Sequence, residues 1–275
     1  MLKDGHKLLV LMDPHIQTSP DGKGGWKPDT SKALETALRF GEWWKPDEVI
    51  IGHDFMEFAP ISYWNQNLRL DMEGRRLIHD FEYANRILDR IMAFAGGKVM
   101  FQDGNHDDWM NSYIQRQPEL EGLLNQRLQL RFKERGIDHQ RMGQVYKVGK
   151  AAFTHAWLRK RSAVAKYHSY KMAEDYGNSI FYGHFHQHQV YTRITYDSQP
   201  HAAVAIGCLS DLNPGWTRNC PNNWVNQFLF LEFDKQGHFT YYAPILIHAK
   251  FMYGGMTFGP DGPAPTSVPE EMEGA

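Results

Sequence analysis

The chain has 275 residues, of which 42% are hydrophobic and 23% are charged, and its formal net charge is −2. This is ordinary usage for a large globular domain, and without a basic excess there is no argument for a general nucleic-acid-binding surface. Two cysteines, Cys208 and Cys220, are too few for a disulfide scaffold or a cysteine-rich zinc site, and we expect both to be reduced thiols.

No apolar run approaches the ~20 residues that span a bilayer. The apolar stretch at residues 8–12 is also too short to be the core of a signal peptide, and it ends in Asp13. We therefore expect a soluble, cytoplasmic protein that has no membrane partner, and we infer no obligatory protein partner.

Apolar runs of strand length alternate with helical patterns along the first part of the chain. The predicted strands are 7–12, 48–51, 98–101, 151–154, 179–182, 202–206, 227–233 and 239–247. The predicted helices are 30–45 with Asp29 or Thr30 as the cap, 72–95, 119–135 and 160–176.

Alternating strands and helices favour crossover units, whereas the later run of strands favours antiparallel pairing. A mixed sheet, or a sandwich of two mixed sheets with helices outside, satisfies both patterns, and we predict an α/β fold. Residues 1–258 form one predicted domain. Residues 259–275 are rich in Pro, Gly and Glu with almost nothing to bury, and we expect a flexible acidic tail.

Five short polar blocks each follow a predicted strand and together supply carboxylate, imidazole and carboxamide groups. They are Asp13-Pro14-His15, His53-Asp54, Gly104-Asn105-His106-Asp107, Thr154-His155 and Gly183-His184-Phe185-His186. Each block alone has an ordinary explanation, because Asp-x-His is frequent by chance and a single His is more often a core residue than a ligand. The five together indicate a paired divalent-metal site that attacks phosphate esters.

The spacing within the blocks is consistent with metal binding. Asp13 and His15 lie two apart at a strand end and can chelate one ion. Asp54 is the natural carboxylate to bridge two ions, and Asn105 offers a neutral oxygen. His184 and His186 can project into the same site or divide between the two ions.

The order of these blocks resembles the calcineurin-like metallophosphoesterase superfamily. The family pattern is Asp-x-His, then Gly-Asp with an acid three residues later, Gly-Asn-His-Asp/Glu, a His, and Gly-His-x-His. The match extends over roughly residues 7–190, and the segments 46–51 and 207–209 are similar too. More narrowly, the chain is similar to single-domain members found in bacteria and bacteriophages. The resemblance implies a metallophosphatase-type β-sandwich flanked by helices.

The resemblance also implies a role for each residue. One ion would be held by Asp13, His15 and His186, the other by Asn105, His155 and His184, and Asp54 would bridge them. His106 would face the substrate and either protonate the leaving oxygen or stabilise charge on the phosphoryl group. Glu57 stands where the family has an acid that orients this histidine.

Two positions depart from the family pattern. His53 precedes Asp54 where the family usually has Gly, and Ala156 follows His155 where Gly is common. His53 could be an extra ligand, a support for a ligand, or a bystander. We expect it to support a ligand or to face solvent, because the usual set is already complete. Neither departure removes a ligand.

Two segments near these blocks could contact a substrate. Residues 158–173 contain five basic residues and three aromatic or imidazole rings without an acid: Arg159, Lys160, Arg161, Lys166, Tyr167, His168, Tyr170 and Lys171. They could hold an anion or stack on bases, or they could form a solvated helix face, and the two readings are equally supported. Residues 211–224 read as a long loop that could line the cleft.

The sequence therefore favours a dinuclear phosphoesterase with Mn²⁺, Fe or Zn²⁺ as its two divalent ions. A phosphate ester is the expected substrate, and we favour phosphodiesters of nucleic acid or nucleotides because of the basic and aromatic segment. A phosphomonoesterase on the same scaffold and a metal-binding module without turnover are the alternatives.

Overall fold

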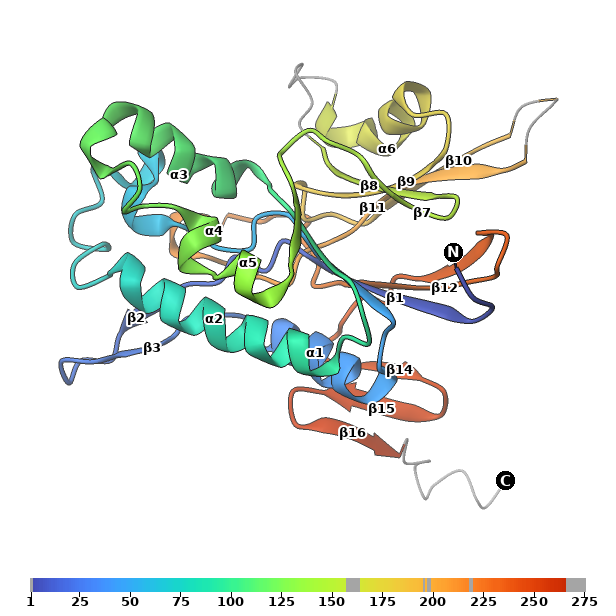
Figure 1. Cartoon of the computed structure of the whole chain (residues 1–275), viewed down its shortest axis with the longest axis horizontal. Coiled ribbons are helices and arrows are strands. Elements are labelled where there is room, and N and C mark those ends of the chain that lie inside the picture. Colours follow the sequence, from blue (N-terminus) through green and yellow to red (C-terminus); the bar gives the residue numbers. More distant parts are fainter. Residues whose placement is uncertain (1, 157–163, 195, 197–198, 218–219, 266–275) are drawn as a thin grey trace.

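Two mixed β-sheets dominate the computed structural model, which describes residues 2–156, 164–194, 196, 199–217 and 220–265 (Figure 1). In the six-stranded sheet the order is β13 (Phe239–Tyr242), β12 (Leu229–Phe233), β1 (His6–Met12), β4 (Glu48–Gly52), β5 (Val99–Gln102) and β6 (Asp138–Gln140). β1, β4, β5 and β6 run parallel to one another. β12 pairs antiparallel with β1, and β13 pairs antiparallel with β12.

The five-stranded sheet has the order β10 (Gln189–Arg193), β11 (His201–Ala205), β9 (Ser179–Gly183), β8 (Ala151–His155) and β7 (Tyr146–Val148). Its three central strands are parallel, and its two edge strands are antiparallel.

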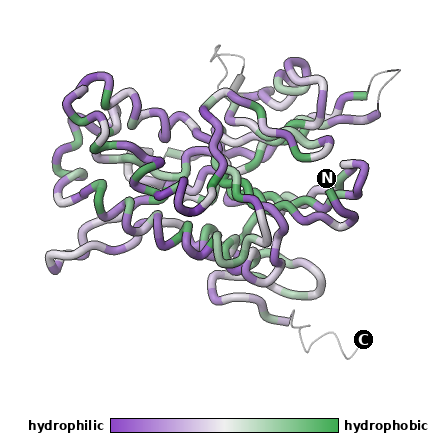
Figure 2. The backbone as a smooth tube through the Cα atoms, viewed as in Figure 1, coloured by the Kyte–Doolittle hydropathy of each residue, from purple (hydrophilic) through white to green (hydrophobic). Residues whose placement is uncertain are grey.

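The period-two pattern of the central strands divides the core into layers. From β1, Leu8 and Val10 pack against the other sheet, whereas Leu9 and Leu11 pack under the helices. This alternation buries both faces of the strand, which is why β1 reads as a continuous apolar run. Figure 2 shows the most hydrophobic segments along these central strands.

Helices cover the outer face of each sheet (Figure 1). α1 (Lys32–Trp44) and α2 (Leu77–Phe94) bury apolar side chains against the six-stranded sheet. α6 (Val164–Asp175) places Met172 and Ala173 against the five-stranded sheet. The predicted α/β fold, a sandwich of mixed sheets flanked by helices, is confirmed.

The remaining elements lie outside the two large sheets and their covering helices. They are β2 (Thr18–Pro20), β3 (Trp26–Pro28), η1 (Ala59–Ile61), η2 (Tyr63–Asn65), α3 (Asn105–Arg116), η3 (Pro118–Leu120), α4 (Gln126–Gln129), α5 (Phe132–Arg135), η4 (Gly215–Thr217), β14 (Phe251–Tyr253), β15 (Met256–Gly259) and β16 (Gly262–Pro265). β14, β15 and β16 form a small antiparallel sheet, and its Phe251 and Phe258 pack edge-on against Phe40 of α1.

Two predicted helices have different bounds from those expected. α1 is capped by Ser31, whose side chain accepts from the backbone N–H of Ala33, and not by Asp29 or Thr30. α2 begins at Leu77 rather than at residue 72, because Gly74 has a φ of 75° and the preceding residues form turns. Residues 160–163 of the fourth predicted helix lie outside the described residues.

The predicted helix 119–135 is wrong. The segment is divided into η3, α4 and α5, because Asn125 caps a new helix at the backbone N–H of Arg127 and Leu128. Arg131 then adopts a φ of 52°, which interrupts the helical path again.

Two predicted boundaries near the carboxyl end also shift. The last predicted strand, 239–247, stops at Tyr242, two residues before Pro244, which has no N–H for the ladder. The predicted tail starts too early, because Gly262–Pro265 pairs with β15 as β16. Residues 266–275 lie outside the described residues.

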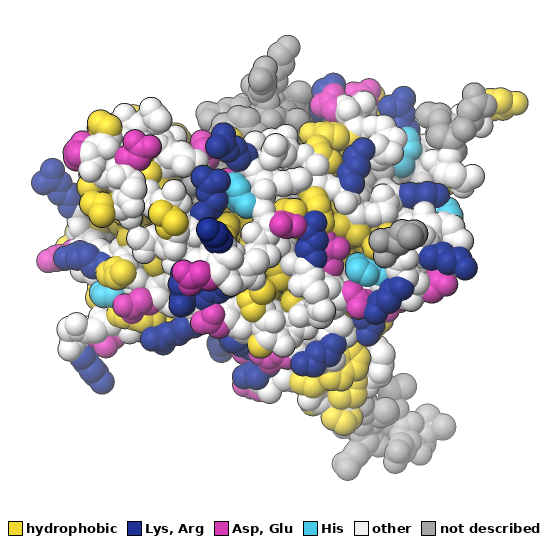
Figure 3. All heavy atoms as spheres, in the orientation of Figure 1, with side chains coloured by type: hydrophobic (Ala, Val, Ile, Leu, Met, Phe, Trp, Pro, Cys, Tyr) yellow, Lys and Arg dark blue, Asp and Glu magenta, His cyan; other side chains and the backbone are white. Residues whose placement is uncertain are grey.

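The surface in Figure 3 mixes Lys and Arg with Asp and Glu over the visible face, in keeping with the small net charge. Both cysteines are free thiols, Cys208 buried and Cys220 exposed. Among the described helices, none combines the length and the hydropathy needed to cross a membrane.

Candidate metal centre

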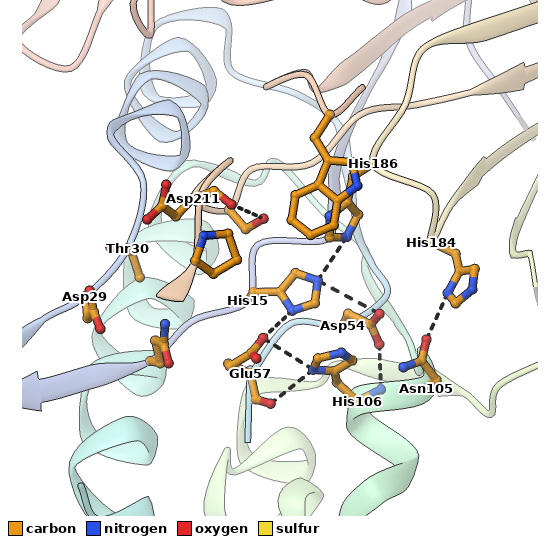
Figure 4. A pocket seen from close by; sticks show the side chains of 14 residues that line it. His15, Asp29, Thr30, Asp54, Glu57, Asn105, His106, His184, His186 and Asp211 are labelled. Carbon is orange, nitrogen blue, oxygen red and sulfur yellow. Dashed lines mark hydrogen bonds and ion pairs between the residues drawn. The ribbon is translucent and has the colours of Figure 1, made fainter. Parts of the chain in front are cut away.

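The polar blocks meet because parallel strands present their carboxyl ends at one edge of a sheet. Asp13 and His15 follow β1, and Asp54 follows β4. Asn105 begins α3 just after β5. His155 ends β8, and His184 and His186 follow β9 in the other sheet. The two sheet edges face one another, so all seven predicted ligands come together. Figure 4 shows five of them, His15, Asp54, Asn105, His184 and His186.

One cluster of donor atoms joins β1 to the loop after β9. His15 Nε2 lies 3.2 Å from His186 Nε2, and His186 Nε2 lies 3.6 Å from Asp13 Oδ2. His15 Nε2 is 4.0 Å from Asp54 Oδ2. These three residues and one oxygen of Asp54 therefore face a common point.

A second cluster gathers around Asn105. Its Oδ1 lies 2.9 Å from both His155 Nε2 and His184 Nδ1, and these two nitrogens are 3.0 Å apart. His155 Nε2 is 3.6 Å from Asp54 Oδ2. The same Asp54 oxygen thus approaches both clusters, while Asp54 Oδ1 accepts the backbone N–H of His106 at 2.7 Å.

These separations suit two metal ions. Ligand atoms bound at about 2.1 Å to one ion lie about 3.0–3.4 Å apart, and the nearest atoms in each cluster are 2.9–3.2 Å apart. The donor set of two carboxylates, one carboxamide and four imidazoles fits Mn²⁺, Fe or Zn²⁺. Metal-binding residues predicted from the sequence therefore form groups that could hold ions.

Backbone strain is concentrated at the same residues. Among the described residues, eleven other than Gly have positive φ, and six of them lie in the blocks: Asp13 (46°), His15 (48°), His53 (66°), Asp54 (40°), His184 (95°) and His186 (57°). Such conformations persist where the surrounding structure enforces them, and they cluster at ligand-binding sites.

Burial controls the protonation of the clustered groups. It raises the pKa of Asp13 well above its usual value, with the nearby Asp54 adding to the effect. It lowers the pKa of His155 and His186 well below the usual value, and neighbouring imidazoles lower it further. The two histidines are therefore neutral at pH 7, which leaves each ring with one lone pair to donate.

His106 stands on the first turn of α3, with its ring fixed on two sides. Its Nδ1 lies 3.0 Å from the backbone O of Glu57 and 3.3 Å from Glu57 Oε2, and its ring stacks on Trp109 at 3.7 Å. Burial alone would lower the pKa of His106, but the carboxylates of Glu57 and Asp54 outweigh it and raise the pKa to about 9.

Glu57 supports two histidines rather than one. Besides its contact with His106, its Oε2 lies 2.6 Å from His15 Nδ1. Burial opposes ionisation of Glu57, but His106 and His15 together hold its pKa well below the usual range. The sequence indicated the first contact through the family pattern and gave no signal for the second. It also missed Trp109, whose only signal is its place three residues after His106 on a helix.

The two departures from the family pattern are both buried. Ala156 is buried next to the ligand His155. His53 is fully buried, so the expectation that it could face solvent is wrong. Burial lowers the pKa of His53 to about 3.

A pocket of about 160 Å³ opens onto the two clusters. His15, Asp54, Asn105, His106, His184 and His186 form its floor (Figure 4). Asp211, Pro214 and Trp224 come from the long loop, which confirms that this loop lines the cleft. Asp29 and Asp211 are acidic, and the described residues that line the pocket include no Lys or Arg.

The basic and aromatic segment is only partly described. Arg159, Lys160 and Arg161 lie outside the described residues. Lys171 pairs with Glu174 at 3.3 Å and with Asp175 at 3.6 Å, as expected for a solvated helix face. His168 is buried and stacks on Phe185 at 4.1 Å, which ties α6 to the loop that bears His184 and His186.

Two solved structures of Vps29 show a distant similarity to this chain. No protein-family model matches the chain, and no curated protein matches it in sequence. A solved structure of Vps29 from Entamoeba histolytica, complexed with Zn²⁺, is 14% identical and covers 88% of this chain and 93% of that one, with a TM-score of 0.38. Vps29 from Chaetomium thermophilum is 9% identical and covers 87% and 97%, with a TM-score of 0.36. Such weak matches support no argument about the site, which rests on the geometry above.

A substitution at Gly104 tests whether metal binding depends on the close approach of Gly104 to Asp54. A Cβ at this position would lie 2.6 Å from the backbone N of Asp54 and would overlap the carboxylate as well. We expect Gly104→Ala to displace Asp54 and to lower Mn²⁺ affinity at least about 10-fold, measured by equilibrium dialysis. Gly177→Ala is the matched control, because a Cβ there meets nothing within 4 Å. Equal Mn²⁺ affinity in the two variants would contradict the close approach of Gly104 to Asp54.

Proposed function

We propose that the chain is a dinuclear metal-dependent phosphoesterase of the calcineurin-like type, and that it hydrolyses phosphodiesters with a metal-activated water. The observation that supports this most is the placement of Asp54. One of its oxygens approaches a donor cluster on each side, at 4.0 Å from His15 and 3.6 Å from His155. A carboxylate shared in this way is what a paired metal site requires.

In this proposal the ligands divide between two ions. Asp13, His15 and His186 would hold one ion, Asn105, His155 and His184 would hold the other, and Asp54 would contribute to both. Two bound divalent ions would lower the pKa of a water molecule between them and offset negative charge on the phosphoryl group. Mn²⁺, Fe and Zn²⁺ all suit this mixture of imidazole and oxygen ligands.

His106 is the residue that we assign to proton transfer. Its Nδ1 is held by Glu57, which leaves Nε2 available to a substrate in the pocket that His106 lines. The carboxylates around it keep the ring protonated at pH 7, as a donor to a leaving oxygen must be. The N-terminus of α3, which begins at Asn105, adds a positive dipole end favourable to phosphate.

The charge of the pocket favours diesters over monoesters. A monoester is a dianion near pH 7, and recognition of a dianion usually relies on Arg or Lys. The described lining instead offers Asp29 and Asp211. A phosphodiester carries one negative charge and is repelled less. Nucleic acid or a nucleotide is the class that we favour, because Trp224 in the pocket wall offers a surface on which a base can stack.

Replacing the bridging carboxylate tests the paired site. We expect Asp54→Asn to lower the hydrolysis of bis-p-nitrophenyl phosphate by about 10³-fold or more, because several kcal/mol of charge stabilisation depend on the ions. Asp21→Asn changes a carboxylate in an exposed loop and should leave the rate unchanged. Wild-type turnover by Asp54→Asn would disprove the bridging role.

Replacing the proton donor should separate turnover from metal binding. We expect His106→Ala to reduce kcat by about 10²–10⁴-fold while two ions remain bound, as measured by elemental analysis of the purified protein. His238→Ala removes an exposed imidazole and is the control. Loss of metal from His106→Ala would show that this residue is a ligand instead.

A pair of substrates with the same leaving group tests the diester preference. We expect kcat/KM to be higher for bis-p-nitrophenyl phosphate than for p-nitrophenyl phosphate, because the acidic pocket repels the dianion more strongly. A higher value for the monoester would favour a phosphomonoesterase, and no turnover of either ester with any of the three metals would favour a binding module.

A further inference from the structure

His53 is a buried polar residue whose position calls for an explanation. It directly follows β4, and its backbone N–H donates to the O of Gln102 at 3.0 Å. Its side chain is fully buried, neither ring nitrogen makes a well-formed hydrogen bond, and the Gln102 amide is a polar group beside the ring. Its φ of 66° adds backbone strain. A buried polar group without partners is rare in folded proteins, so this one indicates a role that the protein contacts alone do not fulfil.

Two of the proposed metal ligands, Asp13 and His155, lie beside His53. One nitrogen or oxygen atom from each of Asp13, His53 and His155 lies within 4.8 Å of the others. Asp13 Oδ1 and His155 Nδ1 are also buried without partners. The described lining of the pocket includes none of the three residues, so a substrate does not supply what they lack.

Gln102 also adjoins His53. Its Nε2 donates to Gln140 Oε1 at 3.2 Å and to the O of Phe153 at 3.3 Å, and this fixes the orientation of the amide. Its Oε1 is left buried without a partner, and the amide adjoins the His53 ring. An N–H of His53 is the donor that this oxygen needs.

The unmatched atoms form a complete set around one water molecule. His155 Nε2 lies beside Asn105 Oδ1 among the proposed ligand atoms, so when Nε2 gives its lone pair to an ion, Nδ1 bears the proton and needs an acceptor. Asp13 Oδ1 and the second nitrogen of His53 need donors. A water accepts once and donates twice, and two groups that share a water lie about 4.6 Å apart when each bond is about 2.8 Å.

We propose that His53 is a positioning residue that, together with Asp13 and His155, holds a buried water and thereby orients the imidazole of His155 toward its ion. The hydrogen-bond chain runs from His155 through the water to His53 and on to Gln102. This proposal rests on the proposed function, because it concerns the metal ligands of the same site. Groups that orient metal-bound histidines in this way alter metal affinity by about 10–100-fold.

A third metal ion in the same place is the competing assignment. It would require His155 to lose its Nδ1 proton and to bridge two ions as an imidazolate. It would also place a third doubly positive ion next to the two that the proposed function already assigns. The water needs neither change.

The test compares His53→Leu, which removes both polar nitrogens, with His53→Gln, which retains a donor and an acceptor. His6→Leu is the control, because His6 lies at the opposite end of β1 from Asp13. Mn²⁺ binding is measured by equilibrium dialysis, and the thermal midpoint of each protein is measured in EDTA. The second measurement detects damage to packing in the metal-free protein.

We expect wild type and His6→Leu to bind two Mn²⁺ ions. His53→Leu should retain one ion at wild-type affinity and bind the ion at His155 about 10–100-fold more weakly. Asp13 keeps the backbone N–H of His184 as a second support at 2.6 Å, so the other ion is spared. His53→Gln should stay within about threefold of wild type. The midpoint of His53→Leu in EDTA should fall and that of His53→Gln should not, because only the leucine leaves Gln102 Oε1 and the buried water without a hydrogen-bonding partner.

Several results would overturn the positioning role. His53→Leu could bind both ions as wild type does, or wild type could bind three ions and His53→Leu two. A fall in the EDTA midpoint that His53→Gln shares, together with equal losses at both ions, would assign His53 to packing. A wild-type protein that binds no Mn²⁺ would instead contradict the proposed function itself.

Discussion

The two clusters of donor atoms both depend on the position of the buried Asp54 carboxylate. Its Oδ1 is anchored by the backbone N–H of His106 at 2.7 Å, which directs Oδ2 toward His15 on one side and His155 on the other. Gly104 permits this approach, because any Cβ there would overlap the carboxylate. This hydrogen bond also fixes Asp54 relative to the first turn of α3. The same turn presents Asn105, His106 and the positive end of the helix dipole to the pocket, and all three have a role in the proposed function.

The β-sandwich explains how the fold tolerates seven clustered polar side chains, several of which are buried. Seven polar side chains are held at strand ends whose remaining residues form the apolar core, so the site is supported by rigid elements on both sheets. The strained φ values of Asp13, Asp54 and His184 follow from the same geometry, because the chain must turn sharply where each strand stops. In the further inference, His53 and a buried water extend the hydrogen bonds of the site from His155 to Gln102.

The parts of the molecule that the sequence predicted are those with strong local signals. The strands β1, β4, β5, β8 and β9 are continuous apolar runs that end abruptly in polar blocks, so both their existence and their meeting point could be inferred. The helix α3 was missed because few of its residues are apolar, and the break at Arg131 was missed because nothing local predicts a positive φ at an arginine. The contact of Glu57 with His15 and the burial of His53 depend on packing between distant segments, which no single sequence pattern encodes.

The central claim is that two ions occupy the two donor clusters on either side of Asp54. Anomalous diffraction from crystals grown with Mn²⁺, recorded above and below the manganese absorption edge, tests it most directly. Two anomalous peaks about 3.5–4 Å apart are expected, one among Asp13, His15 and His186 and the other among Asn105, His155 and His184, with Asp54 between them. A single peak, or peaks away from Asp54, would contradict this claim.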